Sequence, residues 1–303
     1  MPASLRELRQ RRKSVSATKK ITRAMELIAS SRIIRAQQAA ARALPYTREL
    51  NRAVSAVANK SRLDHPLTRD VENPQRVAVL FITSDRGMNG AYSSNVIKTV
   101  AAFRQREEEQ EGREIVRYVV GRKGIGYLKY RNIPIHAQWE GFSDAPTYDR
   151  AVEIANTLLD DFLRPTEEGG VDEIWAVYTR MESMLTQTPR IRRLLPLEVV
   201  EGVQEPDPEH PDALYLFEPD PDDVLNALLP LYVRSRVWFY LLQSAASQLA
   251  SQQRAMKSAT DNAQQLIERL TREANQARQA EITQEISEIV GGASALADLT
   301  ENE

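Results

Sequence analysis

The chain has 303 residues, enough for one large domain or two small ones. Lys and Arg total 40 against 42 Asp and Glu, and the net charge of −2 gives no general attraction to nucleic acid or anionic lipid. Cys is absent, which excludes disulfides and thiolate chemistry, and no run approaches the ~18 consecutive apolar residues of a membrane-spanning helix.

The N-terminal segment predicts one long helix. Residues 3–44 contain neither Gly nor Pro, whereas an ordinary helix has about 12 residues. We expect this helix to run over about 3–59, within an N-terminal coiled-coil segment at 1–60. Its expected apolar side consists of Leu5, Leu8, Val15, Ile21, Met25 and Ile28.

The middle of the chain, 75–220, predicts an α/β domain. Runs rich in β-branched and aromatic residues alternate with helical patterns, which favours a sheet whose strands are at least partly parallel. Two later runs are interpreted as further strands that could pair antiparallel. The expected strands are 76–84, 114–121, 133–139 and 171–179, then 186–199 and 213–219, and the expected helices are 90–110, 121–131 and 146–164.

The C-terminal segment, 221–299, predicts a second and longer helix. Residues 231–290 are 60 consecutive positions without Gly or Pro. A heptad seam with alternating spacings of four and three residues runs through them, which is typical of a coiled coil. The seam consists of Trp238, Leu242, Ala245, Leu249, Gln252, Met256, Ala259, Ala263, Leu266 and Leu270.

The two long helices are expected to pair. Sixty helical residues extend ~90 Å, whereas a compact domain of about 140 residues is under roughly 40 Å across, so the last helix must extend beyond the domain. The first helix enters the domain by its C-terminal end and the last leaves by its N-terminal end. They must therefore pair antiparallel.

Counted outward from the domain, the last helix (about 222–289) exceeds the first by roughly ten residues. Residues 277–293 should then form an unpaired overhang. Its apolar stripe has no partner within the chain, so another chain should cover it. The stripe consists of Ile282, Ile286, Ile289 and Val290.

The motifs of catalysis and cofactor binding are missing from the sequence. TSDRGMNGAYSSN at 83–95 and GRKGIGYLK at 121–129 follow strands, but neither has the glycine spacing of a phosphate or dinucleotide loop. The three histidines are widely separated, which disfavours a metal site. We expect tight turns at these loops, no cofactor and no active site of the chain's own.

Charge is placed unevenly along the chain. Residues 1–44 carry eleven Arg or Lys against two Glu, and 205–223 carry eight acids and no base. Both segments could be solvated surfaces. Alternatively, the basic helix faces an acidic partner.

Three blocks of sequence carry a resemblance to a known family. They are KKITRAMELIASSRI at 19–33, SDRGMNGAYSSN at 84–95, and MKSATDNA with RQAEITQEISEIVGGA at 256–263 and 278–293. The chain resembles the γ subunits of F-type ATP synthases nearly from end to end. In the middle block, Met88 and Asn89 stand where the family more often has Leu followed by Cys or Ala.

The resemblance implies a fold of α/β class with long helices: an antiparallel two-helix coiled coil with an inserted Rossmann-like α/β domain. It implies a non-catalytic central-stalk rotor that couples ion-driven rotation of the membrane c-ring to ATP synthesis or hydrolysis at the β subunits. The implied partners are the α3β3 hexamer, the ε subunit and the c-ring, with one copy of the chain per complex and no nucleic acid. The implied location is the cytoplasmic face of the bacterial plasma membrane, as a peripheral protein.

The resemblance also implies roles for particular residues. Arg278, Gln279, Thr283 and Glu285 would contact a β subunit, and the apolar stripe of the overhang would turn in a sleeve formed by the surrounding subunits. Met25 matches a methionine of the family's coupling region, although packing in the helix seam is an equal alternative. Residues that would contact ε and the c-ring from the foot are Tyr215, Leu216, Phe217 and Glu218.

Two other functions fit parts of the sequence. A coiled-coil adaptor could bind an acidic protein or nucleic acid through the basic N-terminal helix, and it should function alone. A freestanding α/β nucleotide-binding enzyme should bind a small ligand alone. A rotor should need an α3β3 hexamer.

Overall fold

The computed structural model describes residues 4–58, 65–197, 218 and 220–300. The chain divides into two compact units, one formed by residues 1–28 with 255–303 and the other by residues 29–254. Two long helices contribute to both units: α1 (Leu5–Ala58) and α5 (Pro221–Thr300). Among the described residues, no helix has an apolar stretch long enough to cross a membrane.

The larger unit contains a five-stranded sheet in the order β3-β2-β1-β4-β5. Strands β1 to β4 are parallel and β5 pairs antiparallel with β4, so both expectations for the sheet are confirmed. The order of the first four strands is that of a Rossmann-like fold. The strands are β1 (Arg76–Ile82), β2 (Glu114–Val120), β3 (Ala137–Trp139), β4 (Glu173–Met181) and β5 (Gln187–Leu195). The strand expected at 213–219 lies outside the described residues, apart from Glu218.

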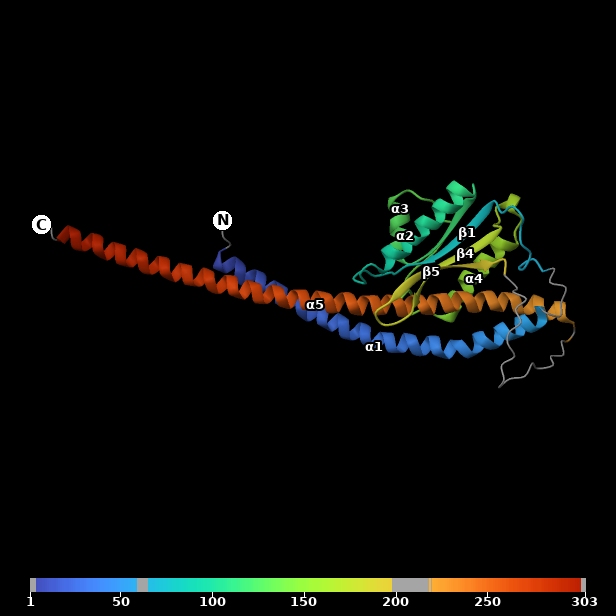
Figure 1. Ribbon diagram of the computed structural model, residues 1–303, viewed down its shortest axis with the longest axis horizontal. Helices are drawn as coiled ribbons and strands as arrows, with labels where there is room; N and C mark the ends of the chain where they lie inside the picture. Colours follow the sequence, from blue (N-terminus) through green and yellow to red (C-terminus); the bar gives the residue numbers. More distant parts are fainter. Residues whose placement is uncertain (1–3, 59–64, 198–217, 219, 301–303) are drawn as a thin grey trace. The chain divides into compact units, whose positions relative to one another are not determined.

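Helices cover both faces of this sheet, with α2 and α3 on one face and α4 and α5 on the other (Figure 1). Val77, Val79 and Phe81 of β1 pack toward α2 and α3, whereas the alternate residues of the strand pack toward α4 and α5. This double burial explains why β1 reads as a continuous apolar run. The remaining elements are α2 (Tyr92–Gln105), the π-helical turn η1 (Arg106–Gln110), α3 (Arg122–Tyr130), α4 (Tyr148–Leu163) and η2 (Thr166–Glu168).

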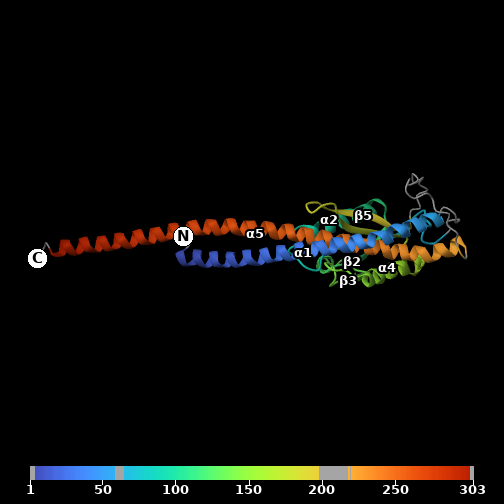
Figure 2. The same cartoon turned by 90° about the horizontal axis from the view of Figure 1, so that it is seen from below.

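In the smaller unit, the N-terminal part of α1 lies side by side with the stretch of α5 that precedes the overhang (Figures 1 and 2). Leu8 packs with Leu270 and Ala274. Further along, the Thr260 hydroxyl donates to the Thr22 hydroxyl over 2.8 Å. As the residue number rises in α1 it falls in α5, so the pairing is antiparallel, as expected.

The apolar side predicted for α1 is partly wrong. Ile21 and Ile28 are 61% and 54% exposed, whereas Thr22 and Glu26 are buried. Leu8 and Thr22 are two heptads apart, so Ile21 lies about 100° away from the face that meets α5. Polar residues can occupy that face because they have partners: Glu26 accepts from Arg23 at 2.9 Å, and Thr22 accepts from Thr260.

Two predicted boundaries are also corrected. The C-terminal helix spans Pro221–Thr300, close to the expected segment 221–299, but it passes the end near 289 from which the overhang was counted and continues through Gly291 and Gly292. A glycine inside a helix costs only about 1 kcal/mol, which the ladder of a long helix can offset. Strand β3 is shorter than the expected 133–139, because it pairs with β2 only over Ala137–Trp139.

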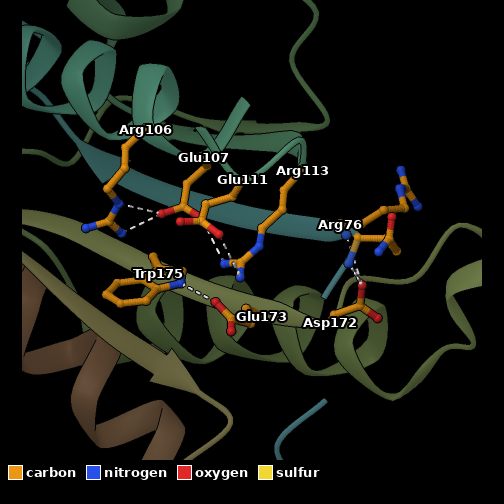
Figure 3. A network of polar contacts seen from close by, with 9 residues as sticks. Arg76, Arg106, Glu107, Glu111, Arg113, Asp172, Glu173 and Trp175 are labelled. Atoms are coloured by element: carbon orange, nitrogen blue, oxygen red, sulfur yellow. Dashed lines mark hydrogen bonds and ion pairs between the residues drawn. The ribbon is translucent and has the colours of Figure 1, made fainter. Parts of the chain in front are cut away.

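Ion pairs and hydrogen bonds connect the segments where β1, β2 and β4 begin (Figure 3). Glu107, in η1, is buried and accepts from Arg106 and from Arg113, the latter over 3.0 Å. The Asp172 carboxylate accepts from the backbone N–H groups of Gln75 and Arg76 at 2.7 and 2.9 Å. These contacts tie the start of β1 to the residue that precedes β4.

We predict that Gly121→Ala lowers the stability of the α/β domain. Gly121 has φ of 97°, and a Cβ there would lie 2.3 Å from the Thr83 carbonyl oxygen, so the free energy of unfolding should fall by more than about 2 kcal/mol. Gly126→Ala is the matched control, because nothing lies within 4 Å of its Cβ position. Urea unfolding followed by Trp fluorescence measures both. Equal stability of the two variants would contradict the prediction.

Candidate functional site

The two glycine-containing loops bind each other. The first backbone N–H groups of α3 are already hydrogen-bonded: Arg122 donates to the Asp85 carboxylate at 3.2 Å, Lys123 to the Ser84 carbonyl at 3.0 Å and Gly124 to the Thr83 hydroxyl at 2.9 Å. A helix N-terminus that binds phosphate needs such N–H groups free. In this chain the loop after β1 accepts those hydrogen bonds in place of a phosphate. This favours the interpretation that the glycines of both loops form tight turns.

The Asp85 carboxylate holds together the loops that follow the parallel strands. It also accepts from the backbone N–H of Ser143 at 2.9 Å, and the Ser143 hydroxyl accepts from the Asp85 N–H at 2.8 Å. Burial alone would raise the pKa of the Asp85 carboxyl, but hydrogen bonds from the backbone of Gly141, Ser143 and Arg122 outweigh it and lower the pKa.

Helix α5 fills the other place where a sheet of this order binds ligands, the crevice beyond the carboxyl ends of β1 and β4. The Ser247 hydroxyl donates to the Thr179 carbonyl at 3.0 Å, and the Ser251 hydroxyl donates to the Asn89 carbonyl at 2.9 Å. Sequence reasoning missed these serines. Their spacing of four residues in a glycine-free helix was the available signal.

The two described histidines, His65 and His136, have different partners. His65 Nδ1 accepts from the backbone N–H of Leu67 at 3.0 Å, and His136 Nε2 lies 3.0 Å from the Asp161 carboxylate. His210 lies outside the described residues. Within the described part of the chain, no three acidic or histidine side chains cluster as metal ligands would.

The overhang of α5 is uncovered in the chain by itself. The apolar packing with α1 ends at Ala277, and every residue from 278 to 291 is exposed. Ile286 and Ile289 are 56% and 70% exposed. The stripe of Ile282, Ile286, Ile289 and Val290 is therefore free to meet another chain.

The polar residues of the overhang are equally accessible. Arg278, Gln279 and Glu285 are exposed. The Thr283 hydroxyl donates to the Gln279 carbonyl of its own helix at 2.9 Å. These side chains thus lie beside the apolar stripe, at the surface.

Of the other predicted contact residues, the structure describes Met25 and Glu218. Met25 is half-buried in α1, and Met256 of α5 is buried in the same unit. Of the predicted foot contacts, Glu218 is exposed, and Tyr215, Leu216 and Phe217 lie outside the described residues.

Most of the basic residues of α1 are exposed, although Arg32 pairs with Asp144 at 2.7 Å. Of the eleven Arg and Lys among residues 1–44, only Lys19 is half-buried, and its ammonium donates to Gln264 Oε1 at 2.5 Å. The acidic segment at 205–223 lies mostly outside the described residues.

Comparison with known proteins places the chain in a family. The model of the family described as ATP synthase matches residues 4–296. An ATP synthase gamma chain of Nocardioides sp. is 59% identical over 298 residues, which cover 98% of each chain, and one of Cutibacterium acnes is 57% identical with the same coverage.

Solved structures agree on the fold. A chain from the mitochondrial ATP synthase of Euglena gracilis matches with a TM-score of 0.64 at 16% identity, covering 96% of this chain and 94% of that one. A chain from the central stalk and c-ring of the Tetrahymena thermophila enzyme matches with a TM-score of 0.56 at 21% identity, covering 79% of this chain and 99% of that one.

The match along nearly the whole length shows that the chain belongs to the ATP synthase family. Within that family its relatives are the gamma chains, the central-stalk γ subunits of the F-type enzyme, which are non-catalytic because the catalytic sites lie on the β subunits. The adaptor and the freestanding enzyme are thereby set aside.

We predict that Asp85→Asn destabilises the domain in a pH-dependent way. The folded-state pKa of Asp85 lies below the unfolded value, so its stabilisation is present at neutral pH and is lost as the pH falls below about 4. The variant should unfold ~1 kcal/mol more easily at about pH 7, and this difference should shrink near about pH 3. Urea titrations at both pH values measure it, with the exposed Asp160→Asn as control. A pH-independent difference would contradict the assignment.

Proposed function

We propose that the chain is the rotor shaft that couples ion-driven rotation of a membrane c-ring to ATP synthesis or hydrolysis at the β subunits. The continuity of α5 supports this most directly. It begins at Pro221 within the α/β unit and reaches Thr300 beyond the last contact with α1. A single hydrogen-bonded helix can carry torque between groups that bind at different points along it.

The partners follow from the two kinds of surface. The α/β unit would rest on ε and the c-ring, with Tyr215, Leu216, Phe217 and Glu218 among the contacts. The overhang would stand inside the α3β3 hexamer, where only one copy of the chain fits along the axis. The complex would hold the chain at the cytoplasmic face of the bacterial plasma membrane as a peripheral protein.

The exposed stripe of the overhang would act as a bearing. Apolar contacts are non-directional, so Ile282, Ile286, Ile289 and Val290 can turn within an apolar sleeve without losing specific bonds. The polar side chains beside the stripe would supply angular preference. Arg278, Gln279, Thr283 and Glu285 can form charge-assisted or neutral hydrogen bonds with a β subunit, and Met25 would lie in the same coupling region.

The exposed bases of α1 support an acidic partner for this helix. Ten cations lie at the surface among residues 1–44. They would attract acidic loops of the β subunits over distances up to the ~8 Å screening length.

We predict that Arg278→Ala with Gln279→Ala weakens coupled turnover while the isolated chain folds normally. Charged hydrogen bonds contribute about 1.5–3 kcal/mol, so turnover of the reconstituted complex should fall roughly tenfold. Arg272→Ala with Gln276→Ala is the matched control, because it removes the same two residue types from exposed positions of the paired region. Unchanged coupled turnover would refute the β contact of these two residues.

We predict that Ile286→Asp impairs assembly. A carboxylate placed inside an apolar sleeve loses its hydration without gaining a partner, so the yield of complex should fall on the order of tenfold. Ser287→Asp adds the same charge one residue further, outside the stripe, and should assemble. Native mass spectrometry measures both, and wild type should give one copy of this chain per α3β3. Normal assembly of Ile286→Asp would mean that no such sleeve encloses the residue.

A further inference from the structure

Polar side chains line one face of α5 where the helix passes the carboxyl ends of β4 and β1. Ser244, Ser247 and Ser251 are at most 6% exposed, and Gln243 is half-buried beside them. Spacings of three and four residues put the three serines on one side of the helix. Buried hydroxyl groups require hydrogen-bond partners, and these partners lie in the α/β domain.

The first partners belong to the end of β4. Strand β1 pairs with β4 only as far as Phe81 and Val177, so the next backbone groups of β4 on that side have no strand beside them. The Ser244 hydroxyl accepts from the Thr179 N–H at 3.4 Å, and the Ser247 hydroxyl donates to the Thr179 carbonyl at 3.0 Å. The Gln243 side chain accepts from the Met181 N–H at 3.3 Å. Side chains of α5 therefore take the place of the missing strand.

The second set of partners belongs to the loop after β1. The Ser251 hydroxyl donates to the Asn89 carbonyl at 2.9 Å, and the Tyr92 hydroxyl donates to the Ser244 carbonyl at 3.1 Å. Burial raises the pKa of the Tyr92 phenol, so this group remains a donor at neutral pH. The helix is thus bonded to the segments after β1 and at the end of β4.

The contacts that α5 makes earlier in its course are of a different kind. Leu229, Val233 and Val237 pack in the apolar core of the domain. Apolar packing resists axial rotation only through shape, whereas a hydrogen bond weakens steeply when its angle changes. Turning α5 by one residue position, about 100°, would withdraw all three serine hydroxyls from their partners.

We propose that Ser244, Ser247 and Ser251 are positioning residues that lock α5 to the α/β domain, so that torque entering through this domain passes to the helix without slip. This inference rests on the proposed rotor function. A shaft must be fixed to one partner and must turn within another. On α5, directional hydrogen bonds would fix the helix to the α/β domain, and the apolar stripe of the overhang would let it turn.

The test compares two triple variants in the full ATP synthase. Ser244→Ala/Ser247→Ala/Ser251→Ala removes the three hydroxyls that cross to the domain. The control is Ser94→Ala/Thr99→Ala/Thr157→Ala, because those hydroxyls donate to carbonyl groups of their own helix or of the residue just before it. We expect hydrolysis by the soluble α3β3γ complex to be retained by both, since that torque arises at the helix. Ion-driven synthesis should fall at least ~5-fold in the first variant alone, since one ordinary hydrogen bond corresponds to a change of about that factor.

Amide hydrogen exchange in the assembled enzyme provides a second readout that needs no rotation. Exchange at Thr179, whose N–H loses its Ser244 acceptor, should quicken at least ~5-fold in the first variant and remain unchanged in the control. Unaltered protection would overturn the lock even in an enzyme that does not turn. Normal exchange protection in a wild-type complex that cannot synthesise ATP would instead count against the rotor function.

If the triple variant does not assemble, single variants test the proposal. Ser247→Ala should lower the ratio of synthesis to hydrolysis, and Ser247→Thr, which keeps a hydroxyl, should restore it at least in part. Equal impairment of both would assign the effect to packing and overturn the proposal. Wild-type ratios in Ser244→Ala, Ser247→Ala and Ser251→Ala would overturn it as well.

Discussion

The continuity of α5 as one helix is the constraint on which the rest of the molecule depends. Pro221–Thr300 forms a single helix, although Pro230 inside it supplies no backbone N–H, so one element must serve as part of a domain core, as half of a coiled coil and as an exposed overhang. The character of its side chains changes along its length accordingly. Buried leucines and valines come first, then buried serines, then an alanine-rich seam, and finally the exposed isoleucines.

The same constraint explains why α5 lies at the place where a Rossmann-like sheet commonly binds a ligand. The crevice beyond β1 and β4 is where such folds hold nucleotides, and in this chain the serines of α5 occupy it. The N-terminus of α3 is closed by Thr83, Ser84 and Asp85 in turn. The groups that bind a ligand in other folds of this topology are hydrogen-bonded within the chain here.

Polar residues in the seam between α1 and α5 follow a similar logic. A purely apolar seam would permit several registers between two alanine-rich helices, because every shift by a heptad would bury similar groups. The bonds from Thr260 to Thr22 and from Lys19 to Gln264 distinguish one register from the others. Specific alignment is obtained with a few small groups, without bulky side chains that would thicken the pair.

The sequence by itself determined the elements and the fold class. The placement of glycine and proline predicted the two long helices, and apolar runs predicted a sheet that is at least partly parallel with later strands that could pair antiparallel. The difference in helix lengths predicted the exposed overhang. These are local or additive properties, since periodicity and breaker placement act along the chain. The family's motifs then supplied the function.

Only the tertiary structure decided which side chains meet. It placed Thr22 and Glu26 of α1 inside and Ile21 and Ile28 outside, a rotation of about 100° that apolar content alone does not predict. It also brought Ser244 and Ser247 to Thr179, some 65 residues away in the chain. Hydrogen-bond partners at such separations depend on how two elements are docked, and a single sequence carries no local signal of that docking.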